Sequence, residues 1–360
     1  MEKFSCKTTI VSGSGVLNAL EEYHAKRLFL VTDPFFQQNG TAQQVAAAAK
    51  AEQVCIFDGV QPDPSVELAA QATARLTEFG PDLLVALGGG SAMDCAKAMA
   101  YFSQGDFPLA AIPTTSGSGS EVTDFAILTH KGVKHPLVDP RLRPDMAILD
   151  SDLLDALPKT LIADAGFDVL THAVEAFAAT GHTTFSDLYA REAFSTAYAC
   201  LPASYAGRKE VRLKVHLAAT MAGLAFTQAG LGLCHAMAHT LGGLFHVPHG
   251  RLNAILLPAV ISTNAHAALP RYAQLARWAG MGGSADTIAL RNLKNGLIRL
   301  RRELDLPETL SQVGISSQSI WNQMGNIVES VLADPCCTTN PLTVEDFQIR
   351  RILEEVSGRG

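Results

Sequence analysis

The stretch Leu83–Ala100, LLVALGGGSAMDCAKAMA, joins a short apolar run to a run of helix-forming residues through three glycines. The apolar run does not alternate with polar residues, which is typical of a parallel strand buried on both faces. Glycines after such a strand let backbone N–H groups approach an anion, and the N-terminus of the next helix adds a favourable dipole. The stretch therefore predicts a strand, a turn suited to phosphate and a helix, which is the repeating unit of an α/β fold.

The same alternation of strand and helix extends from the N-terminal region to Asp150. We expect strands at Arg27–Thr32, Val54–Phe57, Leu83–Leu87, Leu109–Ile112 and Met146–Leu149. We expect helices at Ala42–Ala51, Val66–Phe79 and Ser91–Phe102. This order predicts an open, parallel, Rossmann-like sheet of the dinucleotide-binding kind.

After Asp150 the sequence changes to long segments rich in Ala, Leu and Met, with few β-branched runs. Examples are Ala163–Ala178, Val211–Ala225 and His235–Leu244. These segments predict an all-helical second domain. A chain of 360 residues is long enough for two domains. We place an α/β domain at residues 1–153 and an all-α domain at residues 154–360.

The composition excludes several classes of protein. Hydrophobic residues make up 48% of the chain, and charged residues make up 18%, which excludes a disordered chain. The net charge of −7 and the absence of any Lys/Arg run longer than two argue against a nucleic-acid partner. No apolar stretch approaches a membrane span, and the segment Met1–Lys7 is polar, so we expect a soluble, cytoplasmic protein with no membrane partner.

A second polar loop, Pro113–Glu121 (PTTSGSGSE), follows another expected strand. Two such loops at the carboxyl edge of one sheet suit a ligand with several phosphates or riboses. The acid that usually binds the ribose about 20 residues after the glycines is missing here, and Asp33 instead ends an earlier strand. Asp33 either binds ribose hydroxyls and repels a 2′-phosphate, which would favour NAD over NADP, or caps the turn before Pro34.

Four of the eleven histidines lie within fifteen residues: His235, His239, His246 and His249. Asp168 and His172 are four residues apart in ADAGFDVLTHAVEAF, so on a helix they share a face. Carboxylate oxygen with imidazole nitrogen is a ligand set suited to Fe²⁺ or Zn²⁺. The same spacing nominates His235 and His239, with His249 as a third candidate, whereas His246 precedes Val247 and is expected in a loop.

Together these segments resemble the group III, iron-dependent alcohol dehydrogenase family. The matching stretches occur in family order and cover nearly the whole chain: Gly88–Ala98, Ala111–Thr123, Pro144–Asp150, Gly166–Phe177 and Gly230–Gly250. Within the family, the chain is most similar to the propanol dehydrogenases of propanediol-utilisation microcompartments. The ethanol dehydrogenases of ethanolamine utilisation are the next most similar.

The resemblance implies a set of site residues. It implies that the metal is held by Asp168, His172, His235 and His249. It leaves His239 beside the substrate and the nicotinamide, where we expect this imidazole to relay a proton. It implies that the cofactor is bound by Asp33, Gly89, Gly90, Ser91, Asp94, Thr114, Thr115, Ser118 and Lys134.

The activity implied by the resemblance is a metal-dependent, NAD(H)-linked interconversion of short-chain aldehydes, such as propanal, and primary alcohols, such as 1-propanol. The implied metal is Fe²⁺, with Zn²⁺ as the alternative, and it acts as a Lewis acid while NAD(H) carries the hydride. The implied assembly is a homodimer or a larger homo-oligomer. Microcompartment shell proteins are candidate partners, and the interior of a microcompartment is the alternative to free cytoplasm.

Two other functions compete with this one. A lyase resembling dehydroquinate synthase would need several basic residues around an anionic substrate, but the metal segments are flanked by Ala, Leu, Phe and Met. A non-catalytic scaffold would not need four ligands and two cofactor loops. The chain departs from the family pattern at Phe167, where methionine is common, and at Arg251, where a small or apolar residue is usual.

Overall fold

The computed structural model describes residues 2, 4–131 and 133–358 of the chain. The backbone contacts divide these residues into two compact units. Residues 5–157 form the first, the α/β unit, and residues 158–358 together with Glu2 and Phe4 belong to the second, the helical unit. Each unit is described by itself below.

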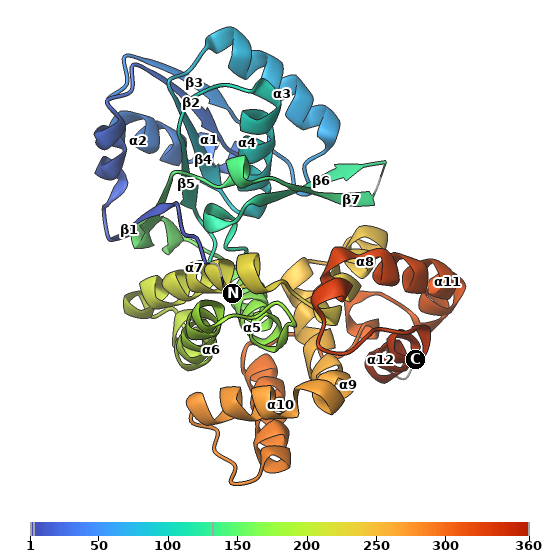
Figure 1. The fold of residues 1–360 in the computed structure, drawn as a ribbon. Coiled ribbons are helices and arrows are strands. Elements are labelled where there is room, and N and C mark those ends of the chain that lie inside the picture. Colours follow the sequence, from blue (N-terminus) through green and yellow to red (C-terminus); the bar gives the residue numbers. More distant parts are fainter. Residues whose placement is uncertain (1, 3, 132, 359–360) are drawn as a thin grey trace. The chain divides into compact units, whose positions relative to one another are not determined.

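The α/β unit is built on a six-stranded parallel sheet in the order β1-β8-β5-β4-β2-β3 (Figure 1). A separate antiparallel hairpin pairs β6 with β7. The strands are β1 (Thr9–Gly13), β2 (Arg27–Val31), β3 (Gln53–Phe57), β4 (Leu83–Gly88), β5 (Leu109–Pro113), β6 (Phe125–His130), β7 (Val133–Val138) and β8 (Met146–Asp150). All five expected strands are present, and β1 and the hairpin are additional.

Two hydrophobic cores cover the two faces of this sheet. Successive side chains of a strand point to opposite faces, so Leu28 and Leu30 of β2 enter one core, while Phe29 and Val31 enter the other. Figure 1 shows α2 on the first face and the pair α3 and α4 on the second. The helices of this unit are α1 (Pro34–Gln38), α2 (Thr41–Ala48), α3 (Val66–Phe79) and α4 (Gly90–Ser103).

The strand order places the predicted nucleotide segments at one edge of the sheet. β4 lies between β5 and β2, and its last residue, Gly88, is in register with Pro113 of β5. The carboxyl ends of these parallel strands therefore bring together Asp33, the glycine turn and the start of the second polar loop. This is the position at which α/β sheets bind ligands.

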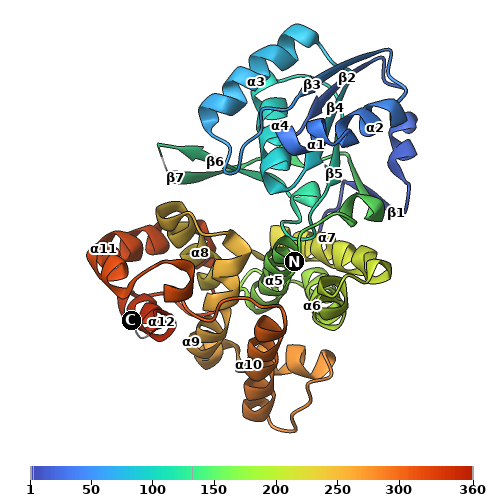
Figure 2. The same cartoon turned by 180° about the vertical axis from the view of Figure 1, so that it is seen from behind.

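The helical unit contains eight helices of eleven residues or more among the described residues (Figure 2). They are α5 (Lys159–Ala178), α6 (Thr184–Tyr205), α7 (Arg212–Ala229), α8 (Leu233–Phe245), α9 (His249–Trp278), α10 (Asp286–Glu303), α11 (Ser317–Ala333) and α12 (Asp346–Val356). α5 is buried along most of its length and packs against α6, α7 and α9. The predicted fold class, a parallel α/β domain followed by an all-helical one, is confirmed.

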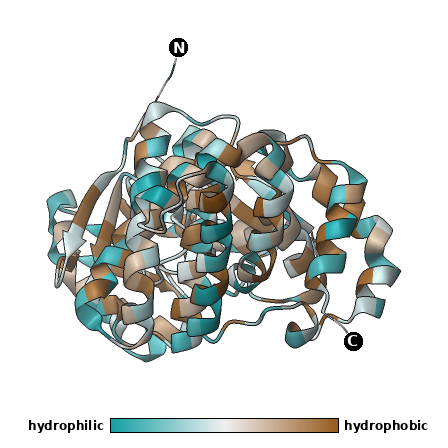
Figure 3. Ribbon diagram, turned by 90° about the horizontal axis from the view of Figure 1, so that it is seen from below, coloured by the Kyte–Doolittle hydropathy of each residue, from teal (hydrophilic) through white to brown (hydrophobic). Residues whose placement is uncertain are grey.

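One helix, α9, is long and apolar enough to cross a membrane by length and composition, and α7 with α8 passes the same test as a bent pair. In α9, however, 67% of the apolar window is buried inside the protein, as in the core helix of a globular fold. α9 also bends at Ala268, two residues before Pro270, because proline cannot continue the helical hydrogen bonds. Figure 3 shows hydrophilic and hydrophobic residues mixed along many of the helices.

Short 3₁₀ helices connect several of these elements. They are η1 (Leu17–Tyr23), η2 (Ser120–Val122), η3 (Pro140–Leu142), η4 (Ser151–Leu154), η5 (Lys209–Val211), η6 (Ser311–Val313) and η7 (Pro335–Thr339). Two of them lie next to the candidate sites described below. η2 ends the second polar loop, and η7 carries residues next to α8.

Candidate functional site

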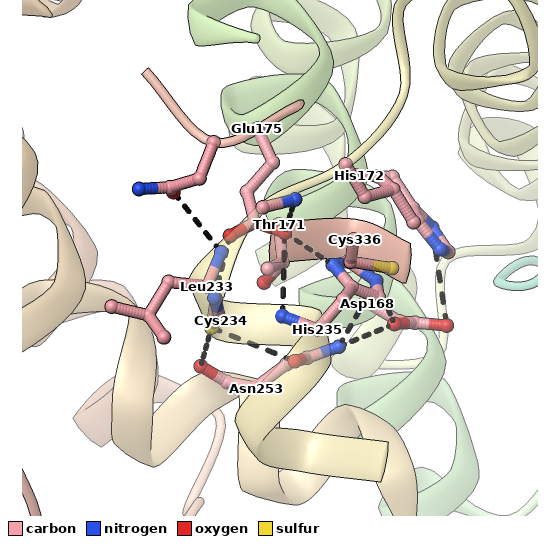
Figure 4. Close-up of polar contacts among 12 residues, drawn as sticks. Asp168, Thr171, His172, Glu175, Leu233, Cys234, His235, Asn253 and Cys336 are labelled. Atoms are coloured by element: carbon pink, nitrogen blue, oxygen red, sulfur yellow. Dashed lines mark hydrogen bonds and ion pairs between the residues drawn. The ribbon is translucent and has the colours of Figure 1, made fainter. Parts of the chain in front are cut away.

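Helix α5 presents three polar side chains within a buried environment: Asp168, His172 and Glu175. Their spacing of four and three residues places them on one face of the helix. Figure 4 shows Asp168 and His172 directed toward His235 of α8. Buried groups of this kind need compensating partners, and each of the three has them.

Asp168 lies at the centre of the candidate metal centre. Its Oδ1 is 3.6 Å from His235 Nε2 and 3.6 Å from His249 Nε2, and the donor atoms of these three residues all lie within 4.8 Å of one another. Two donors bonded at about 2.1 Å to one tetrahedral ion lie about 3.4 Å apart. The three donor atoms therefore fit a divalent metal ion.

His172 borders the same cluster. Its Nδ1 lies 4.0 Å from Asp168 Oδ2, and its ring stacks on those of His235 and Phe226, each with centroids 4.4 Å apart. This stacking holds the imidazole next to the other donors, on the side of α7. This placement is compatible with His172 as a fourth metal ligand, the second one from α5.

The electrostatics of the cluster favour an ionised carboxylate. Burial would raise the pKa of Asp168, but the imidazoles of His172, His249 and His235 outweigh burial and hold this pKa well below its usual range. Asn253 adds a hydrogen bond, donating from Nδ2 to Asp168 Oδ1 at 2.7 Å. An ionised carboxylate beside imidazole nitrogens is the ligand set that iron and zinc bind.

Glu175 holds His235 in place. Its carboxylate accepts hydrogen bonds from the backbone N–H groups of Gly232 (3.0 Å) and Cys234 (2.7 Å), and it lies 2.6 Å from His235 Nδ1. Burial would lower the pKa of His235, but its bonds to Asp168 and Glu175 raise it to about 9. A carboxylate bound to Nδ1 leaves Nε2 directed at the metal position, the usual arrangement of a metal-binding histidine.

His239 belongs to a different polar group. Its Nδ1 lies 2.9 Å from Asp334 Oδ2, and its ring stacks on that of His249 with centroids 5.1 Å apart. The bond to His239 holds the pKa of Asp334 near 2 although burial would raise it. His239, Asp334 and Cys336 form a second group whose donor atoms all lie within 4.8 Å of one another. Burial raises the pKa of the Cys336 thiol well above its usual range.

On the α/β unit, Asp33 performs one of its two expected roles. Its Oδ1 accepts hydrogen bonds from the backbone N–H groups of Phe35 (2.9 Å) and Phe36 (3.2 Å), so Asp33 caps α1. The second oxygen lies toward the glycine turn, 3.7 Å from where a Cβ on Gly88 would stand. Capping therefore leaves one carboxylate oxygen beside the turn.

The two polar loops pack against each other. Thr114 N donates to Gly88 O at 2.9 Å. A Cβ on Gly89 would lie 3.4 Å from Thr115 Oγ1, and a Cβ on Gly90 would lie 3.3 Å from Ser118 Cβ. This packing places the hydroxyl groups of Thr115 and Ser118 beside the start of α4.

Ser91 and Lys134 also meet at this edge, through Asp63. The backbone N–H of Asp63 donates to Ser91 Oγ at 3.3 Å, and its Oδ1 lies 2.6 Å from Lys134 Nζ. Lys134 is carried by β7, so the unexpected hairpin brings this cation to the start of α4. Asp63 therefore links Lys134 to Ser91, the residue that follows the three glycines.

Asp94 and Lys97 form a buried network beneath the second loop. Asp94 accepts hydrogen bonds from Ser120 Oγ (2.8 Å) and Ile127 N (3.1 Å). Lys97 Nζ donates to Ser120 Oγ (2.8 Å) and to Thr123 Oγ1 (2.9 Å), and burial lowers its pKa to about 8. Asp94 therefore supports the loop from below, and a direct contact with a cofactor stays a prediction.

Comparison with known proteins agrees with this geometry. The model of the iron-containing alcohol dehydrogenases matches residues 7–151, and that of the C-terminal region of the Fe-containing alcohol dehydrogenase family matches residues 162–357. The chain belongs to the iron-containing alcohol dehydrogenase family. Enzymes of this family interconvert alcohols and aldehydes with NAD(H) and Fe²⁺.

Two relatives are similar to the chain over nearly their full length. The chain is 37% identical to the 1-propanol dehydrogenase PduQ of Citrobacter freundii, over 99% of this chain and 100% of that one. It is 35% identical to the NADPH-dependent butanol dehydrogenase of Clostridium saccharobutylicum, over 98% and 97%. The structure of the sulfoacetaldehyde reductase of Bifidobacterium kashiwanohense, in complex with NAD⁺, superposes with a TM-score of 0.89 at 26% identity, over 100% of both chains.

Two polar residues of this iron-containing alcohol dehydrogenase were missed in the sequence. Glu175 lies seven residues after Asp168, so extending the helical spacing by one turn would have found it. Asp334 is 95 residues from His239 and has no local signal. His246 was expected in a loop and lies there, directly after α8, in a left-handed conformation with φ at 56°. α8 continues through the two glycines after Leu241 and ends at Phe245.

Proposed function

We propose that this alcohol dehydrogenase reduces short-chain aldehydes, such as propanal, with NADH and oxidises the matching primary alcohols in the reverse direction. The observation that carries the proposal is the group of the buried Asp168 and His235 with the half-buried His249, whose donor atoms fit one divalent ion. The propanol and butanol dehydrogenases among its relatives support a small substrate with a primary alcohol. The apolar residues around the metal segments support it as well.

The proposed ligands of Fe²⁺ are Asp168, His172, His235 and His249, with Zn²⁺ as the alternative ion. A divalent ion bound there supplies Lewis-acid stabilisation of negative charge on the substrate oxygen. Asp168 contributes the one anionic ligand, and Asn253 donates a hydrogen bond to its Oδ1. Glu175 fixes the tautomer of His235 through Nδ1.

His239 is the proposed proton relay. Its Nδ1 is bound to Asp334, so Nε2 is the ring nitrogen left to exchange a proton with the substrate oxygen or water. An imidazole held by a carboxylate in this way keeps one orientation while it gains and loses its second proton. Its stacking on His249 places it next to the proposed metal ligands.

The proposed cofactor contacts lie at the carboxyl edge of the parallel sheet. Backbone N–H groups at the start of α4 suit a pyrophosphate, and the free edge of Asp33 suits ribose hydroxyls. Because a carboxylate repels a 2′-phosphate, Asp33 supports NADH over the NADPH used by the butanol dehydrogenase relative. The proposed residues are Asp33, Gly89, Gly90, Ser91, Asp94, Thr114, Thr115, Ser118 and Lys134.

Several wider features belong to the same proposal. We assign the cofactor to residues 1–153 and the metal to residues 154–360. We propose a homodimer or a larger homo-oligomer located in the cytoplasm. The alternative location that we propose is the interior of a microcompartment, with shell proteins as partners, on the basis of the resemblance to propanol dehydrogenases described above.

The test is an assay of NADH oxidation by purified protein with ethanal, propanal and butanal. We expect turnover with these aldehydes and a preference among them for the three- and four-carbon substrates. A lyase of the dehydroquinate synthase kind would leave NADH unchanged while converting a phosphorylated sugar acid. A scaffold protein would do neither. Absence of aldehyde-dependent NADH oxidation by the iron-loaded protein would overturn the proposal.

A further inference from the structure

Arg251, which departs from the family pattern, has a defined partner in the structure. Its guanidinium forms a two-point ion pair with Asp164, with Nε 3.1 Å from Oδ1 and Nη2 2.8 Å from Oδ2. The side chains of Arg251 and Asp164 are 28% and 10% exposed, so the pair is largely removed from solvent. A planar guanidinium matched to a carboxylate in this way fixes geometry as well as charge.

The position of the pair relates it to the metal donors. Asp164 lies one turn before Asp168 on α5, and Arg251 lies two residues after His249 in the first turn of α9. The ion pair therefore joins the two helices that carry these donors. On each helix, the residue of the ion pair lies within one turn of a proposed metal ligand.

Gly250 shows that the two helices touch at this point. A Cβ on Gly250 would lie 2.0 Å from the carbonyl oxygen of Asp164 and 3.3 Å from Asp168 Cβ, so no larger residue fits without moving the backbone. The N-cap of α9 is Pro248, and no side-chain cap hydrogen bond forms there. Together with the hydrogen bond from Asn253 to Asp168 one turn later, the contact through Gly250 and the ion pair fasten the start of α9 to α5.

We propose that Arg251 and Asp164 are positioning residues that hold His249 at metal-binding distance from Asp168 and thereby set the metal affinity of the chain. The inference rests on the proposed metal centre. Loss of the pair would leave a buried carboxylate without its cation and would free the helix end that carries His249. The expected consequence is a weaker metal site rather than a changed cofactor site.

A competing role for Arg251 is anion binding. Arg251 lines a cavity of about 730 Å³ together with His246 and Arg302. The two arginines of this wall are already paired, Arg251 with Asp164 and Arg302 with Glu308 at 2.7 Å. In each pair the carboxylate neutralises the guanidinium charge and occupies its Nε–Nη2 edge, so positioning is the better-supported role.

The experiment measures metal binding by the full-length, metal-free protein. Co²⁺ is titrated into the wild type, Arg251→Met, Arg251→Lys and Asp164→Asn, and Kd is obtained from the visible absorption of the bound ion. Arg302→Met is the matched control, because it removes a paired arginine from the same cavity. His235→Ala reports loss of a proposed ligand. Thermal midpoints of the metal-free proteins show which variants are folded.

We expect Arg251→Met and Asp164→Asn to raise Kd for Co²⁺ by about 10–100-fold, the range found for residues that orient metal ligands. Arg251→Lys keeps the positive charge but lacks the planar guanidinium that bonds both carboxylate oxygens. Its Kd should therefore fall between those of the wild type and Arg251→Met. Arg302→Met should stay within about threefold of the wild type. If Arg251→Met does not fold, Asp164→Asn and Arg251→Lys give the same comparison.

Several outcomes would overturn the inference. One is an unchanged Kd in the folded Arg251 and Asp164 variants, and another is an equal rise in Arg302→Met. Binding of inorganic phosphate that is lost in Arg251→Met would assign Arg251 to an anion site instead. If the wild type binds no Co²⁺, or if His235→Ala binds it as tightly, the proposed metal centre fails and this inference fails with it. If the Arg251 and Asp164 variants all bind Co²⁺ like the wild type, only the proposed role of the ion pair is refuted, and the proposed metal centre stands.

Discussion

A substitution of Glu175 should change the metal affinity most directly, because its carboxylate holds the proposed ligand His235. Its carboxylate meets four donors: the backbone N–H groups of Gly232, Cys234 and His235, and Nδ1 of His235. Glu175→Gln keeps the size of the side chain but replaces one acceptor oxygen by an NH₂ group. In one orientation the NH₂ group faces Gly232 N and His235 Nδ1, and in the other it faces Cys234 N.

The change acts on His235 through its tautomer. A carboxylate keeps the proton on Nδ1, and Nε2 then has the lone pair that a metal needs. An NH₂ group at the same place favours a proton on Nε2, which blocks coordination. In the alternative orientation of the glutamine amide, His235 keeps its proton on Nδ1, but the NH₂ group faces the backbone N–H of Cys234, which is also a donor. Either arrangement loses a hydrogen bond to a charged group, which is worth about 1.5–3 kcal/mol.

A loss of this size corresponds to a rise in the metal Kd of about 10–100-fold. The assay is competition of the metal-free protein with a chromophoric chelator for Zn²⁺. Glu192→Gln, an exposed change of the same chemistry on α6, is the control and should leave Kd unchanged. A Kd for Glu175→Gln that equals the wild-type value, in protein with a native thermal midpoint, would refute the reasoning.

Three further predictions concern His235 and His239, Asp33, and Lys97. His235→Ala should lose metal and activity together, whereas His239→Ala should keep the metal and lose turnover. Equal metal loss in the two variants, measured by elemental analysis, would contradict these roles. Asp33→Gly should raise kcat/KM for NADPH relative to NADH by about tenfold or more, through about 1.4 kcal/mol of removed repulsion; an unchanged ratio would exclude the ribose contact. Burial lowers the pKa of Lys97 from 10.5 to about 8, so the unfolded chain binds more protons between these pH values. The free energy of unfolding should therefore gain roughly 3 kcal/mol across that window. Urea unfolding should show no such gain for Lys97→Met, and an equal gain in that variant would contradict the buried charge.

Four of the five strands that could be predicted are buried on both faces, and the fifth, β3, is partly exposed. β2, β4, β5 and β8 are apolar runs in which nearly every residue is buried, and such runs can be identified without any knowledge of their neighbours. β1 is half-exposed, with residues TIVSG, and has no continuous apolar run. The hairpin β6–β7 contains Lys134, His135 and Pro136, which weaken a strand signal.

The metal centre could be predicted only in part, for a geometric reason. Helical spacing gives the direction of a side chain around its own helix, so it nominates His235 and His239 equally. The structure groups His235 and His249 with Asp168. That choice depends on the turn between α8 and α9, which brings the start of the next helix back to α5. Partners such as Asp334, far away in the chain, depend on packing that no local pattern contains.

The most direct test of the central claim is the iron dependence of propanal reduction. The protein is stripped of metal with a chelator, and NADH oxidation with propanal is followed before and after anaerobic addition of one equivalent of Fe²⁺. The account predicts negligible turnover without metal and recovery with Fe²⁺ in the wild type, with no recovery in His235→Ala. Full turnover by the metal-free protein, or equal recovery in His235→Ala, would contradict it.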